Sequence, residues 1–309
     1  MKSKIPLEKL SGIWSAAPTP FTARMDVDID SLERMVEHHV RLGVKGLFLA
    51  GTNGEGPWLT EKQKHTMVRS IVKFTRKRLV IAVQVTDNSA ARILDNMAAV
   101  RDDGADIAVI APPFFMMNAT PRNIANLYLE AVEKSPLPVG IYDRGTYSSV
   151  LVPDKVIGEI YAAPNVILAK DSSCKPERRD IALAVRRKKP DLRLLSGYEF
   201  DCVSYLKAGY DGLLLGGGVF NGYLASRLMA AFKDGDPALA ERLQMRMNRM
   251  MWSVYGGRKI KCWLNGEKHL LVEMGIFRTS RTYFNYPLTE GCRKAIRRVL
   301  KNEREFLLP

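Results

Sequence analysis

The stretch from Asp106 to Asp143, "DIAVIAPPFFMMNATPRNIANLYLEAVEKSPLPVGIYD", has a short apolar run at each end and a helical pattern between them. Both apolar runs are continuous rather than alternating, which is typical of parallel strands whose two faces are covered. In the middle, Thr120 is a favourable helix N-cap and Pro121 suits the first helical position. The stretch therefore predicts one strand–helix–strand unit of a parallel sheet.

The same arrangement continues on both sides of this stretch. Further apolar runs predict strands at residues 12–17, 45–50, 79–85, 165–170, 192–197 and 211–217. Between the runs, apolar residues recur at helical spacing, for example Ile93, Met97 and Val100. Strand and helix alternate about eight times between residues 11 and 235, which fits a (β/α)8 TIM barrel of the α/β class. A doubly wound open sheet is the alternative, but no GxGxxG motif opens a helix to support it.

The pattern changes near residue 235. Segments 236–256, 259–276 and 289–306 read as three successive helices, and no Ser/Gly-rich linker precedes them. We therefore expect a barrel over residues 1–235 and a C-terminal three-helix extension over residues 236–309. Because the apolar faces of these helices need a partner, we expect them to pack on the barrel or against a neighbouring subunit.

The composition narrows the class of protein. The 309-residue chain is 46% hydrophobic and 26% charged, which is normal for a protein that buries a large core. No apolar signal segment follows the N-terminal lysines, and no apolar stretch approaches the roughly 20 residues that cross a bilayer. The four cysteines lie far apart without a CxxC pair, which favours a reducing compartment. These observations predict a cytoplasmic protein that does not interact with membranes.

The chain is strongly basic, with 47 Lys and Arg against 33 Asp and Glu and a net charge of +14. The basic runs at residues 73–78 and 186–189 fall where helices are expected to end, and cations there complement the helix dipole. No aromatic residues interleave with these runs, as they would in a nucleic-acid-binding stripe. The charge therefore favours an anionic small substrate over nucleic acid.

The apolar run at residues 165–170 ends on Lys170, which is either exposed at the strand end or buried for use in chemistry. Strand parity puts Lys170 on one face with Val166 and Leu168. Desolvation there would lower the pKa of the amine, and a neutral amine can attack a ketone to form an imine. Tyr142, at the end of another predicted strand, could pass the protons that this chemistry requires.

Five landmarks stand in order along the chain: "PTPF" at 18–21, "GTNGE" at 51–55, Tyr142, Lys170 and "SGYE" at 196–199. Together they resemble the pyruvate-dependent class I aldolases, a family that contains dihydrodipicolinate synthase, N-acetylneuraminate lyase and keto-deoxy sugar-acid aldolases. The resemblance covers roughly residues 9–300. It implies a homotetramer, a dimer of dimers, that uses no cofactor beyond a covalent imine.

The resemblance also implies a role for each matching residue. Lys170 would form the Schiff base with the keto acid, and Tyr142 would shuttle protons. Thr52 and Asn53 would hold the carboxylate of the keto acid, helped by the glycines of their turn. The positions that would line the variable end of the substrate are Ser172, Gly197, Tyr198 and Glu199.

Three departures from the family pattern bear on the reaction. Members usually have a second hydroxyl residue where this chain has Asn53, so an amide would have to donate to the carboxylate. Phe114–Phe115 replace a tyrosine that reaches into the neighbouring active site in many members, and a phenyl ring cannot pass a proton. Dihydrodipicolinate synthases bind the second substrate's carboxylate with an arginine at the position of Tyr147, whereas Arg144 stands at a different offset. Further candidate site residues are Phe115, Arg144, Tyr147 and Leu214.

The leading prediction is an aldolase or lyase that makes or breaks a C–C bond between a 2-keto acid and an aldehyde. A keto-deoxy sugar acid or an N-acetylneuraminate-like substrate suits the hydroxyl-rich "GYE" segment. The alternatives are a dihydrodipicolinate synthase-like condensing enzyme, a sugar-acid dehydratase with the same imine, and a non-catalytic keto-acid-binding paralogue. No metal is expected, because all four histidines lie in helical stretches away from strand ends: His38, His39, His65 and His269.

Overall fold

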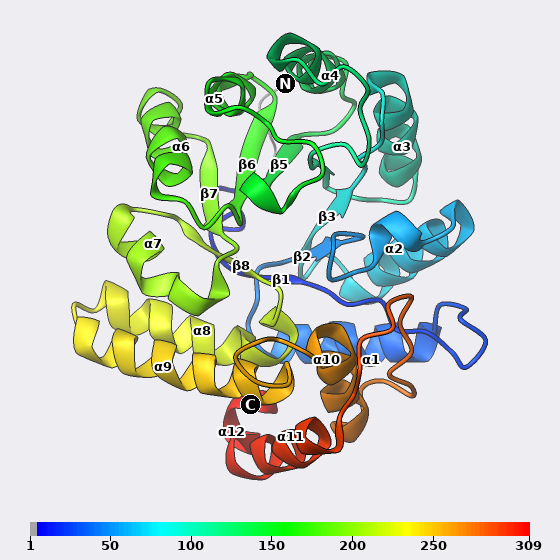
Figure 1. Ribbon diagram of the computed structural model, residues 1–309, viewed down its shortest axis with the longest axis vertical. Coiled ribbons are helices and arrows are strands. Elements are labelled where there is room, and N and C mark those ends of the chain that lie inside the picture. Colours follow the sequence, from blue (N-terminus) through cyan, green and yellow to red (C-terminus); the bar gives the residue numbers. More distant parts are fainter. Residues whose placement is uncertain (1–4) are drawn as a thin grey trace.

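The computed structural model describes residues 5–309, and its eight parallel strands close into a barrel in chain order (Figure 1). The TIM barrel predicted from the sequence is therefore confirmed. The strands are β1 (Gly12–Ala16), β2 (Gly46–Leu49), β3 (Val80–Gln84), β4 (Ile107–Ile110), β5 (Val139–Asp143), β6 (Val166–Asp171), β7 (Arg193–Ser196) and β8 (Gly212–Leu215).

A helix follows each strand and packs outside the barrel (Figure 1). These helices are α1 (Ile29–Arg41), α2 (Glu61–Thr75), α3 (Ala90–Asp102), α4 (Pro121–Glu133), α5 (Asp154–Ala162), α6 (Pro176–Lys188), α7 (Cys202–Ala208) and α8 (Gly218–Lys233). The N-cap predicted for α4 is confirmed, because the Thr120 side chain accepts a hydrogen bond from the backbone of Asn123. The basic run at 186–189 closes α6, and Lys73–Thr75 of the other run lie in the last turn of α2. Three one-turn 3-10 helices lie in strand–helix loops: η1 (Gly56–Trp58), η2 (Gly145–Tyr147) and η3 (Glu199–Asp201).

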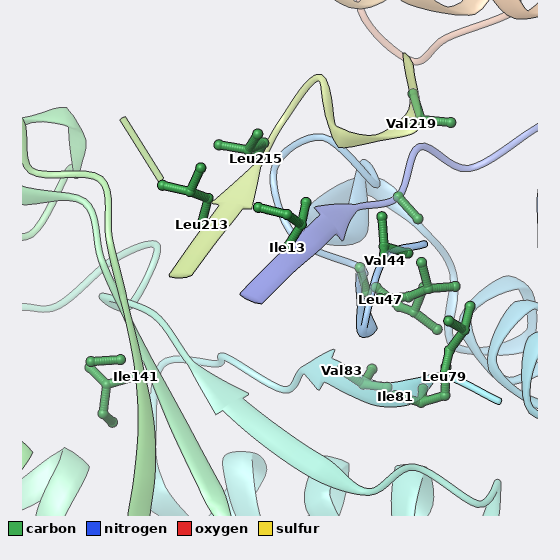
Figure 2. Packing of buried hydrophobic residues seen from close by; sticks show 14 of the residues in the cluster. Ile13, Val44, Leu47, Leu79, Ile81, Val83, Ile141, Leu213, Leu215 and Val219 are labelled. Atoms are coloured by element: carbon green, nitrogen blue, oxygen red, sulfur yellow. The ribbon is translucent and has the colours of Figure 1, made fainter. Parts of the chain in front are cut away.

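The strands are buried on both faces because two apolar layers cover them. One layer fills the barrel and includes Trp14 and Phe48, and Gly46 makes room for it, since a Cβ there would lie 2.6 Å from the Trp14 ring. The other layer lies between the strands and the helices, where Figure 2 shows side chains such as Ile13 and Leu213. Continuous burial on both faces explains why the apolar runs in the sequence do not alternate.

One detail of the predicted strand parity is wrong. Val139 pairs with Val166, but its neighbour Gly140 pairs with Leu168, so β6 carries one extra residue, a β-bulge, against β5. The bulge turns Val166 outward into the helix-facing layer, whereas Leu168 faces the barrel interior as predicted. Lys170 lies beyond the bulge and keeps the interior face.

The C-terminal helices predicted from the sequence are present as α9 (Pro237–Val254), α10 (Trp263–Glu273) and α11 (Glu290–Asn302), followed by the short α12 (Arg304–Leu307). α9 packs along α8, and α11 contacts both α9 and α10. α10 begins at Trp263, later than the residue 259 expected from the sequence, and Ile260 between them adopts a positive φ that is not helical. Among residues 5–309, no helix is both long and apolar enough to cross a membrane.

Candidate active site

A cavity of about 240 Å³ lies at the carboxyl ends of the barrel strands. In parallel barrels this is the end that carries catalytic residues. The cavity is lined by Ala16, Thr52, Asn53, Tyr142, Arg144, Tyr147, Lys170, Ser172, Gly197, Glu199, Gly216 and Trp263. Most of the residues that the sequence points to are thus brought together in one place.

Lys170 lies at the centre of this group, with only 7% of its surface exposed. Its position in β6 is directly beside that of Tyr142 in β5, and its Nζ lies 4.4 Å from the centre of the Tyr142 ring and 5.0 Å from that of Phe48. Burial lowers the pKa of Lys170 below its ordinary value, since it penalises the charged amine. The negative charge of Glu199 opposes this shift, and the positive charge of Arg144 adds to it. The amine is therefore closer to its neutral, nucleophilic form than an exposed lysine.

Tyr142 is buried next to this amine. Burial raises the pKa of its phenol, but the positive charges of Lys170 and Arg144 and hydrogen bonds with Thr52 and Ser172 outweigh that effect. The net result is a pKa below the ordinary value for tyrosine. A phenol of this kind can exchange protons with the amine and with a bound reactant.

Gly197 leaves room for these groups. A Cβ at this position would lie 2.0 Å from the Ser172 hydroxyl and 3.0 Å from Cε of Lys170. Any larger residue would therefore displace the side chains that face the reacting atoms.

The "GTNGE" turn after β2 forms one wall of the cavity. Within residues 5–309, the backbone N–H groups of Thr52 and Asn53 have no hydrogen-bond acceptor. The turn needs its glycines, because a Cβ on Gly51 would lie 2.6 Å from the Phe48 ring and a Cβ on Gly54 would lie 3.0 Å from the carbonyl oxygen of Ala17. Two adjacent free N–H groups can bind a carboxylate.

The Asn53 side chain is held by the protein. Its Nδ2 donates to the carbonyl oxygens of Ala16 (2.8 Å) and Gly216 (3.2 Å). The same atom donates to Oε1 of Glu267 (2.8 Å), which comes from α10. The amide predicted to donate to the substrate carboxylate is already engaged, which leaves the backbone N–H groups as the unoccupied donors of the turn.

Glu199 follows β7, which neighbours β6 on the side opposite to β5. Its carboxylate accepts hydrogen bonds from the backbone N–H of Gly217 (2.7 Å) and from the hydroxyl of Tyr255 (3.1 Å). Burial raises the pKa of Glu199, although these hydrogen bonds and the charge of Lys170 act in the opposite direction. The carboxyl group is therefore fixed in place beside the amine.

The remaining lining residues come from the β5 loop and from α10. Within residues 5–309, the Arg144 guanidinium has no hydrogen-bond acceptor and no carboxylate partner, while Tyr147 is 65% exposed. Trp263, at the start of α10, was missed by the sequence analysis, because nothing local to it indicates which helix covers the barrel. The mouth of the cavity thus combines one unpaired cation with two aromatic rings.

Three of the proposed residues do not line the cavity. Tyr198 packs beside Tyr205 on α7, with ring centres 6.4 Å apart, and Leu214 belongs to the apolar filling of the barrel. Phe115 is 63% exposed on the loop between β4 and α4.

Known proteins resemble this chain over almost its full length. N-acetylneuraminate lyase of Enterobacter sp. (strain 638) is 24% identical over 281 residues, which cover 90% of this chain and 87% of that protein. Among solved structures, dihydrodipicolinate synthase from Bacteroides thetaiotaomicron is 27% identical, with a TM-score of 0.84 and coverage of 95% of this chain and 98% of the other.

YagE from E. coli K12, described as a prophage protein of the dihydrodipicolinic acid synthase family in complex with pyruvate, superimposes with a TM-score of 0.83 at 20% identity. This match covers 95% of the present chain and 98% of YagE, and at that identity it shows the shared fold. Residues 9–301 match the model of the dihydrodipicolinate synthetase family, so the chain belongs to that family.

Proposed function

We propose that this protein is a carbon–carbon lyase of the class I aldolase type, which forms an imine between Lys170 and a 2-keto acid such as pyruvate. The observation that carries the proposal is the buried Lys170 amine, with its lowered pKa, packed against the Tyr142 phenol inside a small polar cavity. The chain also belongs to the dihydrodipicolinate synthetase family and is similar to N-acetylneuraminate lyase, and both findings support a lyase activity.

In the cleavage direction, the neutral amine of Lys170 attacks the carbonyl carbon of the keto acid. Tyr142 passes a proton to the departing oxygen, which leaves as water, and a protonated imine remains. The bond between C3 and C4 then breaks, the C4 hydroxyl proton goes to a base, and an aldehyde leaves. The electron pair moves into the imine and forms an enamine, which is protonated at C3 before water releases the keto acid. The imine is itself the electron sink, so the proposal includes no metal and no organic cofactor.

The free N–H groups of Thr52 and Asn53 would bind the carboxylate of the keto acid. This contact would hold the keto carbon at the amine, and such positioning lowers the barrier of a bimolecular step. In this proposal the wall that meets the carboxylate is made of backbone donors rather than of hydroxyl side chains.

The aldehyde end would lie toward Ser172, Glu199, Arg144 and Tyr147, which combine hydroxyl groups, a carboxyl group and a free cation. Such a set suits a hydroxylated acid. Pockets for drug-sized ligands measure roughly 300–1,000 Å³. The smaller cavity here, about 240 Å³, favours a short keto-deoxy sugar acid over an N-acetylneuraminate-like substrate.

The assembly and the compartment are part of the proposal. Phe115 and Met117, on the loop between β4 and α4, expose 63% and 79% of their surface, which supports burial against a second copy in a homotetramer. Free thiols at all four cysteines support a reducing, cytoplasmic location. Light scattering in solution would give the oligomer number.

The first test is intact-mass spectrometry after incubation with pyruvate and sodium borohydride. We expect a pyruvate-sized adduct on the wild type and none on Lys170→Ala. Lys189→Arg is the control, because burial also lowers the pKa of Lys189, to about 8, yet this lysine lies outside the cavity. A wild-type protein without an adduct would overturn the proposal in favour of a keto-acid-binding paralogue. With the adduct in hand, product analysis separates C–C cleavage from condensation or dehydration.

A further inference from the structure

The helix α10 brings a second carboxyl group, in addition to Glu199, into contact with Asn53, which lines the cavity. Trp263 lines the cavity, and Glu267 stands one helical turn further along with no exposed surface. Between them, Gly266 lets α10 approach the end of α9, since a Cβ at this position would lie 1.9 Å from the carbonyl oxygen of Val254. This close approach places Glu267 directly behind the "GTNGE" turn.

The hydrogen bonding of Glu267 and Asn53 is incomplete if the carboxyl group is ionised. Asn53 Nδ2 donates to Oε1 of Glu267, at 2.8 Å. The second oxygen of each group, Oδ1 of Asn53 and Oε2 of Glu267, is buried without a partner. Both oxygens are then acceptors only, and leaving two buried acceptors unsatisfied is costly.

One proton on Glu267 would give both of these oxygens a hydrogen-bond partner. A neutral carboxylic acid has one O–H donor and one carbonyl acceptor, and a primary amide has the matching N–H donor and carbonyl acceptor. The two groups can therefore form a pair of antiparallel hydrogen bonds. Protonation of Glu267 at Oε2 supplies the donor that Asn53 Oδ1 lacks.

The surroundings of Glu267 also favour its neutral form. Burial raises its pKa well above the ordinary value, and the charges of Glu199 and Glu55 add to this effect. The hydrogen bond from Asn53 and the charge of Lys268 act in the opposite direction, but the Lys268 amine is itself paired with Glu55. The other titratable group that faces Glu267 is the phenol of Tyr255, which carries no positive charge.

We propose that Glu267 is a neutral carboxylic acid that clamps Asn53 through two hydrogen bonds and thereby positions the Thr52–Asn53 turn for the carboxylate of the keto acid. The proposal rests on the function proposed above. Glu267 is a positioning residue, because it acts through Asn53. Its neutral form also keeps a negative charge out of the wall that receives an anionic substrate.

Substitution with glutamine and alanine tests the clamp. Glu267→Gln replaces the O–H donor with an N–H donor, and we expect the KM for pyruvate to stay within about twofold of the wild type. Glu267→Ala removes the carboxyl group from Asn53 but leaves the hydrogen bonds of Nδ2 to Ala16 and Gly216. We expect this KM to rise about tenfold, the equivalent of one lost hydrogen bond, with a smaller change in kcat. Glu55→Gln is the matched control, because Glu55 is paired with Lys268 and the same substitution should be damaging there.

Infrared difference spectroscopy between the wild type and Glu267→Gln shows directly whether the Glu267 carboxyl group is protonated. We expect the carbonyl band of a neutral carboxylic acid in the wild type at pH 7 and its loss in the variant. A carboxylate band in its place, or a Glu267→Gln variant as impaired as Glu267→Ala, would overturn the proposal. The infrared result does not depend on imine formation. If borohydride traps no pyruvate, the proposed function fails, and the band still reports whether Glu267 is neutral.

Discussion

Burial and neighbouring charges together set the pKa of the Lys170 amine. Desolvation lowers the pKa of Lys170, Arg144 reinforces this shift, and electrostatic interactions with Tyr142 and Glu199 oppose it. The net effect is a pKa of Lys170 below its ordinary value. The two residues that pull in opposite directions, Glu199 and Arg144, both line the cavity.

This balance predicts opposite pH shifts for two variants. Glu199→Gln removes a charge that raises the pKa of Lys170, so the neutral amine should appear at lower pH. Arg144→Met removes a charge that lowers this pKa, so the neutral amine should appear at higher pH. The measurement is the rate of borohydride trapping with pyruvate as a function of pH, followed by mass spectrometry. Shifts in the same direction for both variants would contradict the assignment of these charges.

At the scale of elements, local patterns and long-range packing contribute differently to the site. The strands, most of the helices, Lys170 and Tyr142 could be predicted because each depends on residues close in sequence. The outward turn of Val166 could not, since the bulge in β6 depends on pairing with β5. Trp263 and Glu267 could not either, because contacts between α10 and distant segments place this helix.

Gly266 is the residue that allows α10 to pack where it does. In Gly266→Ala the new Cβ would meet the carbonyl oxygen of Val254, at 1.9 Å, and backbone cannot yield as a flexible side chain can. We expect the free energy of unfolding to fall by about 3 kcal/mol, the upper part of the range for overpacking. Denaturant titration followed by circular dichroism measures this loss.

Gly291→Ala, in α11, is the matched control for Gly266→Ala. Its Cβ would meet no atom closer than Thr289 Oγ1, at 4.0 Å, and alanine is favoured over glycine in a helix by roughly 0.5–1 kcal/mol. This variant should be neutral or slightly stabilised. Equal loss of stability in the two variants would show that close packing at Gly266 is not the cause.

At the scale of the whole molecule, one buried ion pair ties the first half of the chain to the C-terminal helices. Lys268 of α10 contacts Glu55 of the "GTNGE" turn across 213 positions of sequence, and neither side chain is exposed. The Lys268 amine also donates to the carbonyl oxygen of Arg281 (2.9 Å) and lies 4.4 Å from the centre of the Phe21 ring. The other Glu55 oxygen accepts from the backbone N–H of Tyr283 (2.6 Å). The "GTNGE" turn, α10 and the segment after α10 are thus joined at one point.

We expect the loss of one partner of this pair to lower the free energy of unfolding more than the replacement of both partners. Lys268→Met leaves the Glu55 carboxylate buried without its cation, and removal of one partner of a buried pair typically costs about 3–5 kcal/mol. The double variant Glu55→Gln, Lys268→Met removes both charges, and we expect it to recover a substantial part of that stability. Denaturant unfolding of the wild type, both single variants and the double variant gives the coupling energy. If the double variant loses the sum of the two single losses, the pair contributes no coupling, and the turn and α10 are held together by their other contacts, such as the hydrogen bond from Asn53 to Glu267.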